Sequence, residues 1–167
     1  MRTKTLGLTL AALAIAGLLT FVLAGKPQPA PAVKFSMLSG EVVNTADLKG
    51  KVTLINFWAT SCVTCVKEMP QISATHEKFK ARGYDTIAVA MEYDPPNYVK
   101  NYAERNKLPF KVALDARGEI AKSFGDIRLT PTTFIVDKRG NIVKSFLGEP
   151  NFAELHGLID KLLKEAA

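Results

Sequence analysis

The chain has 167 residues, of which 47% are hydrophobic, and a formal net charge of +6. This length suits one domain with a core of ordinary size plus a short appendage. The 22 lysines and arginines are scattered, without a basic run, so the positive charge does not indicate nucleic-acid binding and we expect no such partner.

The N-terminal segment is strongly apolar. Arg2 and Lys4 precede an uncharged run, residues 6–24, which as a helix would span about 28 Å, close to the thickness of a bilayer's hydrocarbon core. Leading positive charges favour a cytoplasmic N-terminus and an exported C-terminal part. We interpret residues 1–24 as a membrane anchor or a signal peptide. The length of the run favours the anchor, and Val22-Leu23-Ala24 offers a cleavage site for the alternative.

Residues 25–32 carry three prolines at alternate positions, which predicts an extended linker that spaces the domain from the membrane. The domain itself is expected to occupy residues 33–167. Its predicted strands are residues 33–38, 41–43, 52–58, 84–91, 112–114, 132–136 and 142–147. Its predicted helices are residues 62–81, 95–106, 118–124 and a last helix capped by Asn151, with a short helical turn at 45–48. Alternating strands and helices with a terminal hairpin predict a three-layer α/β sandwich around a mixed sheet.

The two cysteines of the chain, Cys62 and Cys65, directly follow the apolar strand predicted at residues 52–58. At a helix N-terminus, unpaired N–H groups and the helix dipole stabilise a thiolate, so Cys62 is the expected nucleophile. A thiolate can attack a partner's disulfide, and a second thiol one turn further on can release the product. Cys65 is expected to lie beneath Cys62 and to be less exposed.

A zinc site is the alternative explanation of two cysteines at this spacing, but it would need two more ligands. The two histidines, His76 and His156, are not spaced as such a pair, and we interpret both as ordinary helix-surface residues. We expect no metal and no cofactor other than a redox-active disulfide between Cys62 and Cys65.

The stretch from Asn56 to Pro70 resembles the active-site segment of the thioredoxin superfamily, and more narrowly that of the exported TlpA/ResA-like thiol-disulfide oxidoreductases. The stretch from Leu129 to Phe134 resembles the segment that carries the cis-proline loop of these proteins, and Gly148 matches the glycine after their last strand. The resemblance implies a thioredoxin-like fold with an N-terminal β-hairpin and an inserted β-α element.

The same resemblance implies roles for individual residues. Cys62 would attack a substrate disulfide, and Cys65 would resolve the mixed disulfide. Trp58, Thr130 and Pro131 would contribute to the substrate site, where the backbone of Thr130 pairs with an extended substrate segment.

Some positions depart from the family pattern. Thioredoxin has an aspartate at the position of Asn56, where it helps deprotonate the buried cysteine; an amide cannot take a proton, so this role must move or vanish. Some relatives place an acidic residue after the next strand. Glu92 and Asp94 are the candidates, and we prefer Glu92 because it ends an apolar run and could be partly buried. Ser61 replaces a tryptophan, which removes an aromatic wall beside the cysteine.

The resemblance implies a periplasmic reductase of protein disulfides, recharged by a membrane thiol carrier of the DsbD or CcdA kind. Its expected clients are apocytochrome c thiols or the copper-site cysteine pair of cytochrome oxidase, and we expect a monomer. Two alternatives stay open: a disulfide oxidase or isomerase, and a copper-delivering metallochaperone. Val63-Thr64 lacks the histidine of the strong oxidant DsbA, which favours the reductase.

Overall fold

The computed structural model describes residues 27–166. Its strands are β1 (Gln28–Pro29), β2 (Lys34–Met37), β3 (Val42–Asn44), β4 (Val52–Trp58), β5 (Tyr84–Ala90), β6 (Lys111–Leu114), β7 (Thr132–Val136) and β8 (Asn141–Leu147). Its helices are α2 (Val63–Phe79), α3 (Pro96–Arg105), α4 (Glu119–Ser123) and α5 (Phe152–Lys164), with 3-10 turns η1 (Thr45–Leu48) and η2 (Lys80–Arg82).

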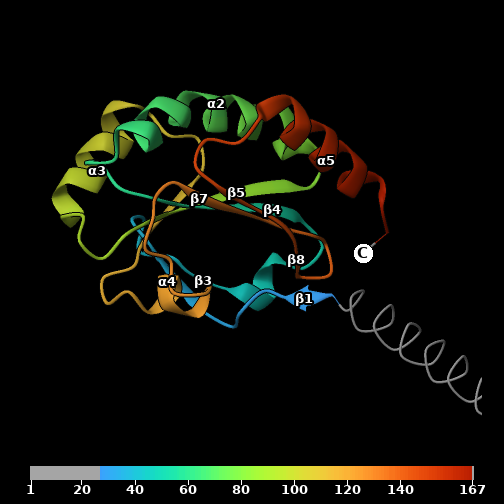
Figure 1. Ribbon diagram of the computed structural model, residues 1–167, viewed down its shortest axis with the longest axis horizontal. Helices are drawn as coiled ribbons and strands as arrows, with labels where there is room; N and C mark the ends of the chain where they lie inside the picture. Colours follow the sequence, from blue (N-terminus) through green and yellow to red (C-terminus); the bar gives the residue numbers. More distant parts are fainter. Residues whose placement is uncertain (1–26, 167) are drawn as a thin grey trace, which may run out of the picture.

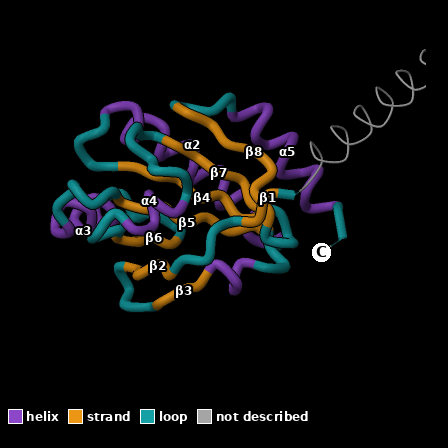
Figure 2. Tube along the Cα trace, turned by 60° about the horizontal axis from the view of Figure 1, so that its bottom comes forward, coloured by secondary structure: helices purple, strands orange, loops and turns teal. Residues whose placement is uncertain are grey.

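Within these residues the strands form one mixed sheet in the order β1-β8-β7-β4-β5-β6-β2-β3 (Figure 2). The central strands β4, β5 and β6 run parallel to one another, and the other neighbouring pairs are antiparallel. All residues of β4 and β5 are buried, because helices cover both faces of the central sheet. Side chains alternate between the faces: Leu54 and Trp58 join one core cluster, whereas Ile55 and Phe57 join the other.

Helices form the two outer layers. Helices α2, α3 and α5 cover one face of the sheet, and α4 lies on the other, near β3 (Figure 1). Met69 of α2 and Ile159 of α5 belong to the first core cluster, and Phe124, directly after α4, belongs to the second. This is the thioredoxin-like three-layer sandwich with a mixed sheet that the sequence predicted.

The predicted elements form close to their expected bounds. The hairpin of β2 and β3 is present, and the side chain of Asn151 accepts hydrogen bonds from the N–H groups of Ala153 and Glu154 at the start of α5. Helix α2 passes into η2 and ends before Gly83, whose φ of 89° lies in the left-handed region that favours glycine.

Strand β1 was not predicted, and it changes the domain boundary. It pairs with the first residues of β8, and the next residue, Ala30, donates from its N–H to the carbonyl of Gly140 at 2.9 Å. The hydroxyl of Thr45 donates to the carbonyl of Pro31 at 2.7 Å. Residues 28–31 of the predicted extended linker are therefore bound to the folded domain, which begins before residue 33. Proline at the edge of a sheet is compatible with this pairing, because the outer side of β1 needs no N–H donor.

The predicted anchor or signal peptide, residues 1–24, lies outside the described residues. Among residues 27–166, no helix is both long enough and apolar enough to cross a bilayer.

His76 is buried rather than on the helix surface, so that prediction is wrong. Its side chain packs between Tyr84 and Phe110, with ring centroids 6.2 and 5.7 Å away, and burial lowers its pKa. His156 is half-buried at the side of α5, with its Nε2 atom 2.9 Å from the hydroxyl of Thr75. Both histidines take structural positions.

Candidate active site

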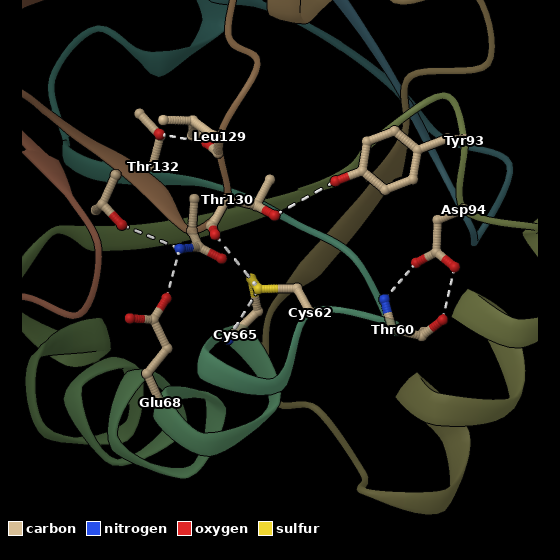
Figure 3. Close-up of a disulfide and its surroundings, with 11 residues drawn as sticks. Thr60, Cys62, Cys65, Glu68, Tyr93, Asp94, Leu129, Thr130 and Thr132 are labelled. Atoms are coloured by element: carbon tan, nitrogen blue, oxygen red, sulfur yellow. Dashed lines mark hydrogen bonds between the residues drawn. A yellow bond between two sulfur atoms is a disulfide. The ribbon is translucent and has the colours of Figure 1, made fainter.

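Three loops, those after β4 and β5 and the one before β7, meet at the same end of the sheet because of the directions of these strands. Parallel strands β4 and β5 terminate at this end, and antiparallel β7 begins there. The residues that follow β4, those that follow β5 and those that precede β7 are therefore brought together. Figure 3 shows these loops around the disulfide.

The cysteine pair sits at the start of α2. Cys62 is the N-cap residue, half-exposed, and Cys65 lies in the first turn with no exposed surface. They form a disulfide with a Cα–Cα distance of 5.2 Å, and the N–H of Cys65 donates to Sγ of Cys62 at 3.2 Å. In the reduced protein the same N–H is placed to stabilise a thiolate at Cys62. The predicted division between an accessible first cysteine and a covered second one is confirmed.

The proline loop faces the disulfide from the start of β7. The peptide bond between Thr130 and Pro131 is cis, as the resemblance implied. The carbonyl oxygen of Thr130 lies 3.5 Å from Sγ of Cys62, and the adjacent Leu129 and the nearby Val63 are 63% and 83% exposed. A substrate segment beside the disulfide would therefore meet a free backbone edge and exposed apolar side chains.

A buried carboxyl group lies one turn behind the cysteines. Glu68 has no exposed surface, and its Oε1 accepts a hydrogen bond of 2.9 Å from the side-chain amide of Asn56 on β4. The same amide nitrogen donates to the hydroxyl of Thr133 at 3.0 Å, so the strands hold the carboxyl group in place (Figure 3). Burial raises the pKa of Glu68 to about 7, the Asn56 hydrogen bond lowers it, and the carboxylate of Glu149 raises it further.

Sequence reasoning missed Glu68, although its position carried a signal. Cys65, Glu68 and Ile72 are spaced as one face of a helix, and from Cys65 to Ile72 the other residues of that face are apolar. A charged residue on a buried helix face needs a partner or a function. The partner is Asn56, the same residue whose departure from the thioredoxin pattern left the proton-accepting role vacant.

The structure separates the two acidic candidates after β5. Glu92 is exposed, and its carboxylate lies against Gly118 at the start of α4 rather than against the cysteine loop. The expectation that Glu92 is partly buried is therefore wrong. Asp94 is buried, with 5% exposure, and both of its oxygens accept hydrogen bonds from Thr60 of the cysteine loop.

Trp58 cannot contact a substrate in this structure, because it has no exposed surface. It ends the central strand β4, which is buried on both faces, and its ring packs on Tyr102 of α3 at a centroid distance of 5.1 Å. Trp58 is therefore a core residue beneath the site, and not the substrate-binding residue that the resemblance implied. Thr130 is half-exposed, and Pro131 is buried beside it.

This geometry agrees with the comparisons with known proteins. A sequence profile of the Redoxin family matches residues 24–159. The chain belongs to the Redoxin family. Within it, the chain is 36% identical over 133 residues to the thiol-disulfide oxidoreductase ResA of Bacillus thuringiensis subsp. konkukian (strain 97-27), covering 80% of this chain and 76% of that protein. ResA of Bacillus subtilis (strain 168) is 29% identical over 121 residues, covering 71% of this chain and 65% of that protein.

Solved structures show the same redoxin fold. A thioredoxin candidate from Neisseria meningitidis superposes with a TM-score of 0.78 at 40% identity, covering 84% of this chain and 93% of that one. StoA from Bacillus subtilis superposes with a TM-score of 0.66 at 26% identity, covering 78% of this chain and 98% of that one. Together with the relatives of the ResA kind, the Cys62–Cys65 disulfide identifies this redoxin as a thiol-disulfide oxidoreductase that acts on protein disulfides.

Proposed function

We propose that this redoxin is an exported reductase of protein disulfides, held at the outer side of the cytoplasmic membrane by its N-terminal segment. The observation that carries the reductase direction is the buried carboxyl group of Glu68 behind Cys65. A strong oxidant stabilises its reduced thiolate with a neighbouring positive charge. Here the neighbouring ionisable group is an acid, whose negative charge opposes a thiolate and so favours the oxidised enzyme, which makes the dithiol a good electron donor.

The reaction starts from the reduced enzyme. The Cys62 thiolate attacks one sulfur of a substrate disulfide, forming a mixed disulfide and releasing the other substrate sulfur as a thiolate, which takes up a proton. Cys65 then attacks Sγ of Cys62 and releases the second substrate thiolate. Two electrons pass to the substrate, and the enzyme ends with the Cys62–Cys65 disulfide that the structure contains.

Glu68 supplies the base for the second step in this proposal. Cys65 is buried, so its thiol needs a proton acceptor that does not depend on solvent. Glu68 is three residues further along α2, where Cβ atoms lie about 5–6 Å apart on the same helix face. With a pKa of about 7, its carboxyl group can both accept and return a proton near neutral pH.

The N-terminal sequence supports the proposed location, and the need for electrons there supports the proposed partners. An uncharged run behind Arg2 and Lys4 supports export to the periplasm, with retention as an anchor or cleavage as a signal peptide. An oxidising compartment requires a source of electrons, and a membrane thiol carrier of the DsbD or CcdA type fits that need. We propose that its clients are proteins of cytochrome c maturation or the copper-site cysteines of cytochrome oxidase. We also propose that the enzyme is a monomer.

Trapping the client tests the assignment of the two cysteines. A Cys65→Ala variant is expected to accumulate mixed disulfides through Cys62, because the resolving thiol is missing. Cys62→Ala is expected to form none and to lose reduction of insulin. The adducts are separated on non-reducing gels and identified by mass spectrometry. Equal adduct formation by both variants, or undiminished insulin reduction by either, would show that the roles are wrong.

Redox titration against glutathione buffers tests the direction. A reductase of this kind is expected to have a midpoint well below that of DsbA, at about −120 mV, and nearer that of thioredoxin, at about −270 mV. A midpoint close to that of DsbA would instead identify a disulfide oxidase.

A further inference from the structure

The loop between β5 and α3 holds the cysteine loop through one buried carboxylate. Oδ2 of Asp94 accepts a hydrogen bond from the backbone N–H of Thr60, and Oδ1 accepts one from the Thr60 hydroxyl, both at 2.6 Å. The bond from the N–H is short even for a charged acceptor, and the bond from the hydroxyl has the usual length for a carboxylate acceptor. Thr60 is two residues before Cys62, so the contact restrains the turn that leads into the N-cap of α2.

Burying the carboxylate of Asp94 costs desolvation free energy. It is 5% exposed and forms no ion pair within residues 27–166, so Thr60 provides the side-chain and backbone contacts that offset its desolvation. Its own N–H donates to the carbonyl of Met91 at 3.0 Å, which closes the loop and orients the carboxylate.

The neighbouring residue reaches the other side of the disulfide. The hydroxyl of Tyr93 lies 3.3 Å from that of Thr130, whose carbonyl lies 3.5 Å from Sγ of Cys62. Consecutive residues of one loop thus contact the segment before Cys62 and the segment before Pro131 (Figure 3). The loop between β5 and α3 therefore holds both the cysteine loop and the proline loop.

We infer that Asp94 is a positioning residue for thiol-disulfide exchange, which acts through Thr60 to hold Cys62 in its N-cap position at the start of α2. The benefit lies in preorganisation: with the turn held, Sγ of Cys62 stays within reach of the Cys65 N–H, which is 3.2 Å away in the structure. With the turn released, a thiolate at Cys62 would lose part of that stabilisation.

Two substitutions at position 94 separate geometry from charge. In Asp94→Asn the amide oxygen can accept from the Thr60 N–H while the amide nitrogen donates to the Thr60 hydroxyl, because a hydroxyl can accept as well as donate. Asp94→Ala lacks both contacts. Neither variant carries the negative charge, so a difference between them cannot come from the charge. Asp160→Ala, which removes an exposed carboxylate of α5 that pairs with Arg82, controls for the general loss of one negative charge.

The test measures Cys62 in the reduced, full-length protein by the pH dependence of its alkylation and by the rate of reduction of a small aromatic disulfide. The alkylation pKa of Cys62 is expected to be higher in Asp94→Ala than in Asp94→Asn. Reduction of the disulfide at neutral pH is expected to be about tenfold slower in Asp94→Ala than in Asp94→Asn. This is about the factor by which one hydrogen bond to a charged group changes an equilibrium. Equal alkylation curves in the two variants would overturn the inference, since the charge or the fold would then explain any effect.

A second variant guards against misfolding. Thr60→Ala keeps the backbone hydrogen bond to Asp94 and loses the hydroxyl bond, and it is expected to shift alkylation in the same direction by a smaller factor than Asp94→Ala. Thr60→Ser restores the hydroxyl and is expected to restore the wild-type curve. If Asp94→Ala does not fold, this pair decides: no shift in Thr60→Ala, or no rescue by Thr60→Ser, overturns the inference.

Discussion

In the proposed mechanism, the carboxyl group of Glu68 on helix α2 takes the role that thioredoxin gives to an aspartate at the position of Asn56 on strand β4. Asn56 stands at that strand position, and its amide donates to Glu68. A buried acid thus lies on the helix three residues beyond Cys65, while strand β4 carries an amide. At the residue scale, the proposal assigns the base of the second half of the reaction to this carboxyl group.

Glu68→Gln is expected to slow resolution of the mixed disulfide by about a hundredfold, the lower end of what a positioned base contributes. Attack by Cys62 should change less, because that thiol is partly exposed to solvent. Stopped-flow measurement of the two phases with a fluorescent disulfide substrate separates the steps. Equal slowing of both phases would argue against a base acting on Cys65.

Glu68 should also make stability depend on pH. Its pKa is about 7 in the folded protein, against 4.5 for an ordinary glutamate. As the pH rises from about 4.5 to about 7, the unfolded chain releases this proton first, so the folded state loses up to about 3 kcal/mol of stability from this group. Urea unfolding of the oxidised protein should show Glu68→Gln gaining stability relative to wild type across this range. Parallel stability curves for the two proteins would contradict the buried titration.

At the scale of elements, α2 connects the site to the rest of the fold. Cys62 is its N-cap and Cys65 lies in its first turn, and Lys67 pairs with Glu149 in the β8–α5 loop at 2.8 Å. Further along, Met69 and Ile72 enter the core that α5 shares through Leu155. The position of the helix is thus set by packing along its whole length, and α5 contributes to it.

The N-cap of α5 gives a clean test of one such element. Asn151→Ala removes the acceptor of two backbone N–H groups and is expected to cost about 1 kcal/mol of unfolding free energy. Asn151→Asp keeps the acceptor and is expected to retain the stability, since a carboxylate is favourable at a helix N-terminus. Thermal or urea unfolding measures both variants. A loss of equal size in Asn151→Asp would show that the cap does not carry the effect.

At the scale of the whole molecule, the chain enters the domain at the end of the sheet opposite the disulfide. Strand β7 begins beside Pro131 with Thr132 paired to Leu147, and its other end, Val136, pairs with Ile142 next to β1. The entering strand β1 therefore lies away from the site end of the molecule.

Removing residues 1–33 tests whether the entering segment belongs to the domain. This truncation loses β1 and the packing of Ala30 and Val33 on the second core cluster, and it is expected to cost about 2 kcal/mol or more. A chain that begins at residue 27 keeps these contacts and is expected to unfold like the full-length protein. Alkylation of Cys62 should be the same in both, because the lost segment lies at the opposite end. Equal stability of the two chains would show that residues 28–32 act as a linker outside the domain, as the sequence predicted.

The sequence by itself determined the fold class, the cysteine pair and its neighbourhood along the chain. These follow from local patterns: the apolar runs of β4 and β5, the periodicity of α2 and the cap at Asn151 are properties of adjacent residues. Only the tertiary structure decided which residues from other parts of the chain lie near the cysteines. Whether Glu68, Glu92 or Asp94 is buried depends on which strands end beside them, and whether residues 28–32 dock depends on the free edge of β8. Burial and long-range pairing come from strand order, which no local pattern specifies.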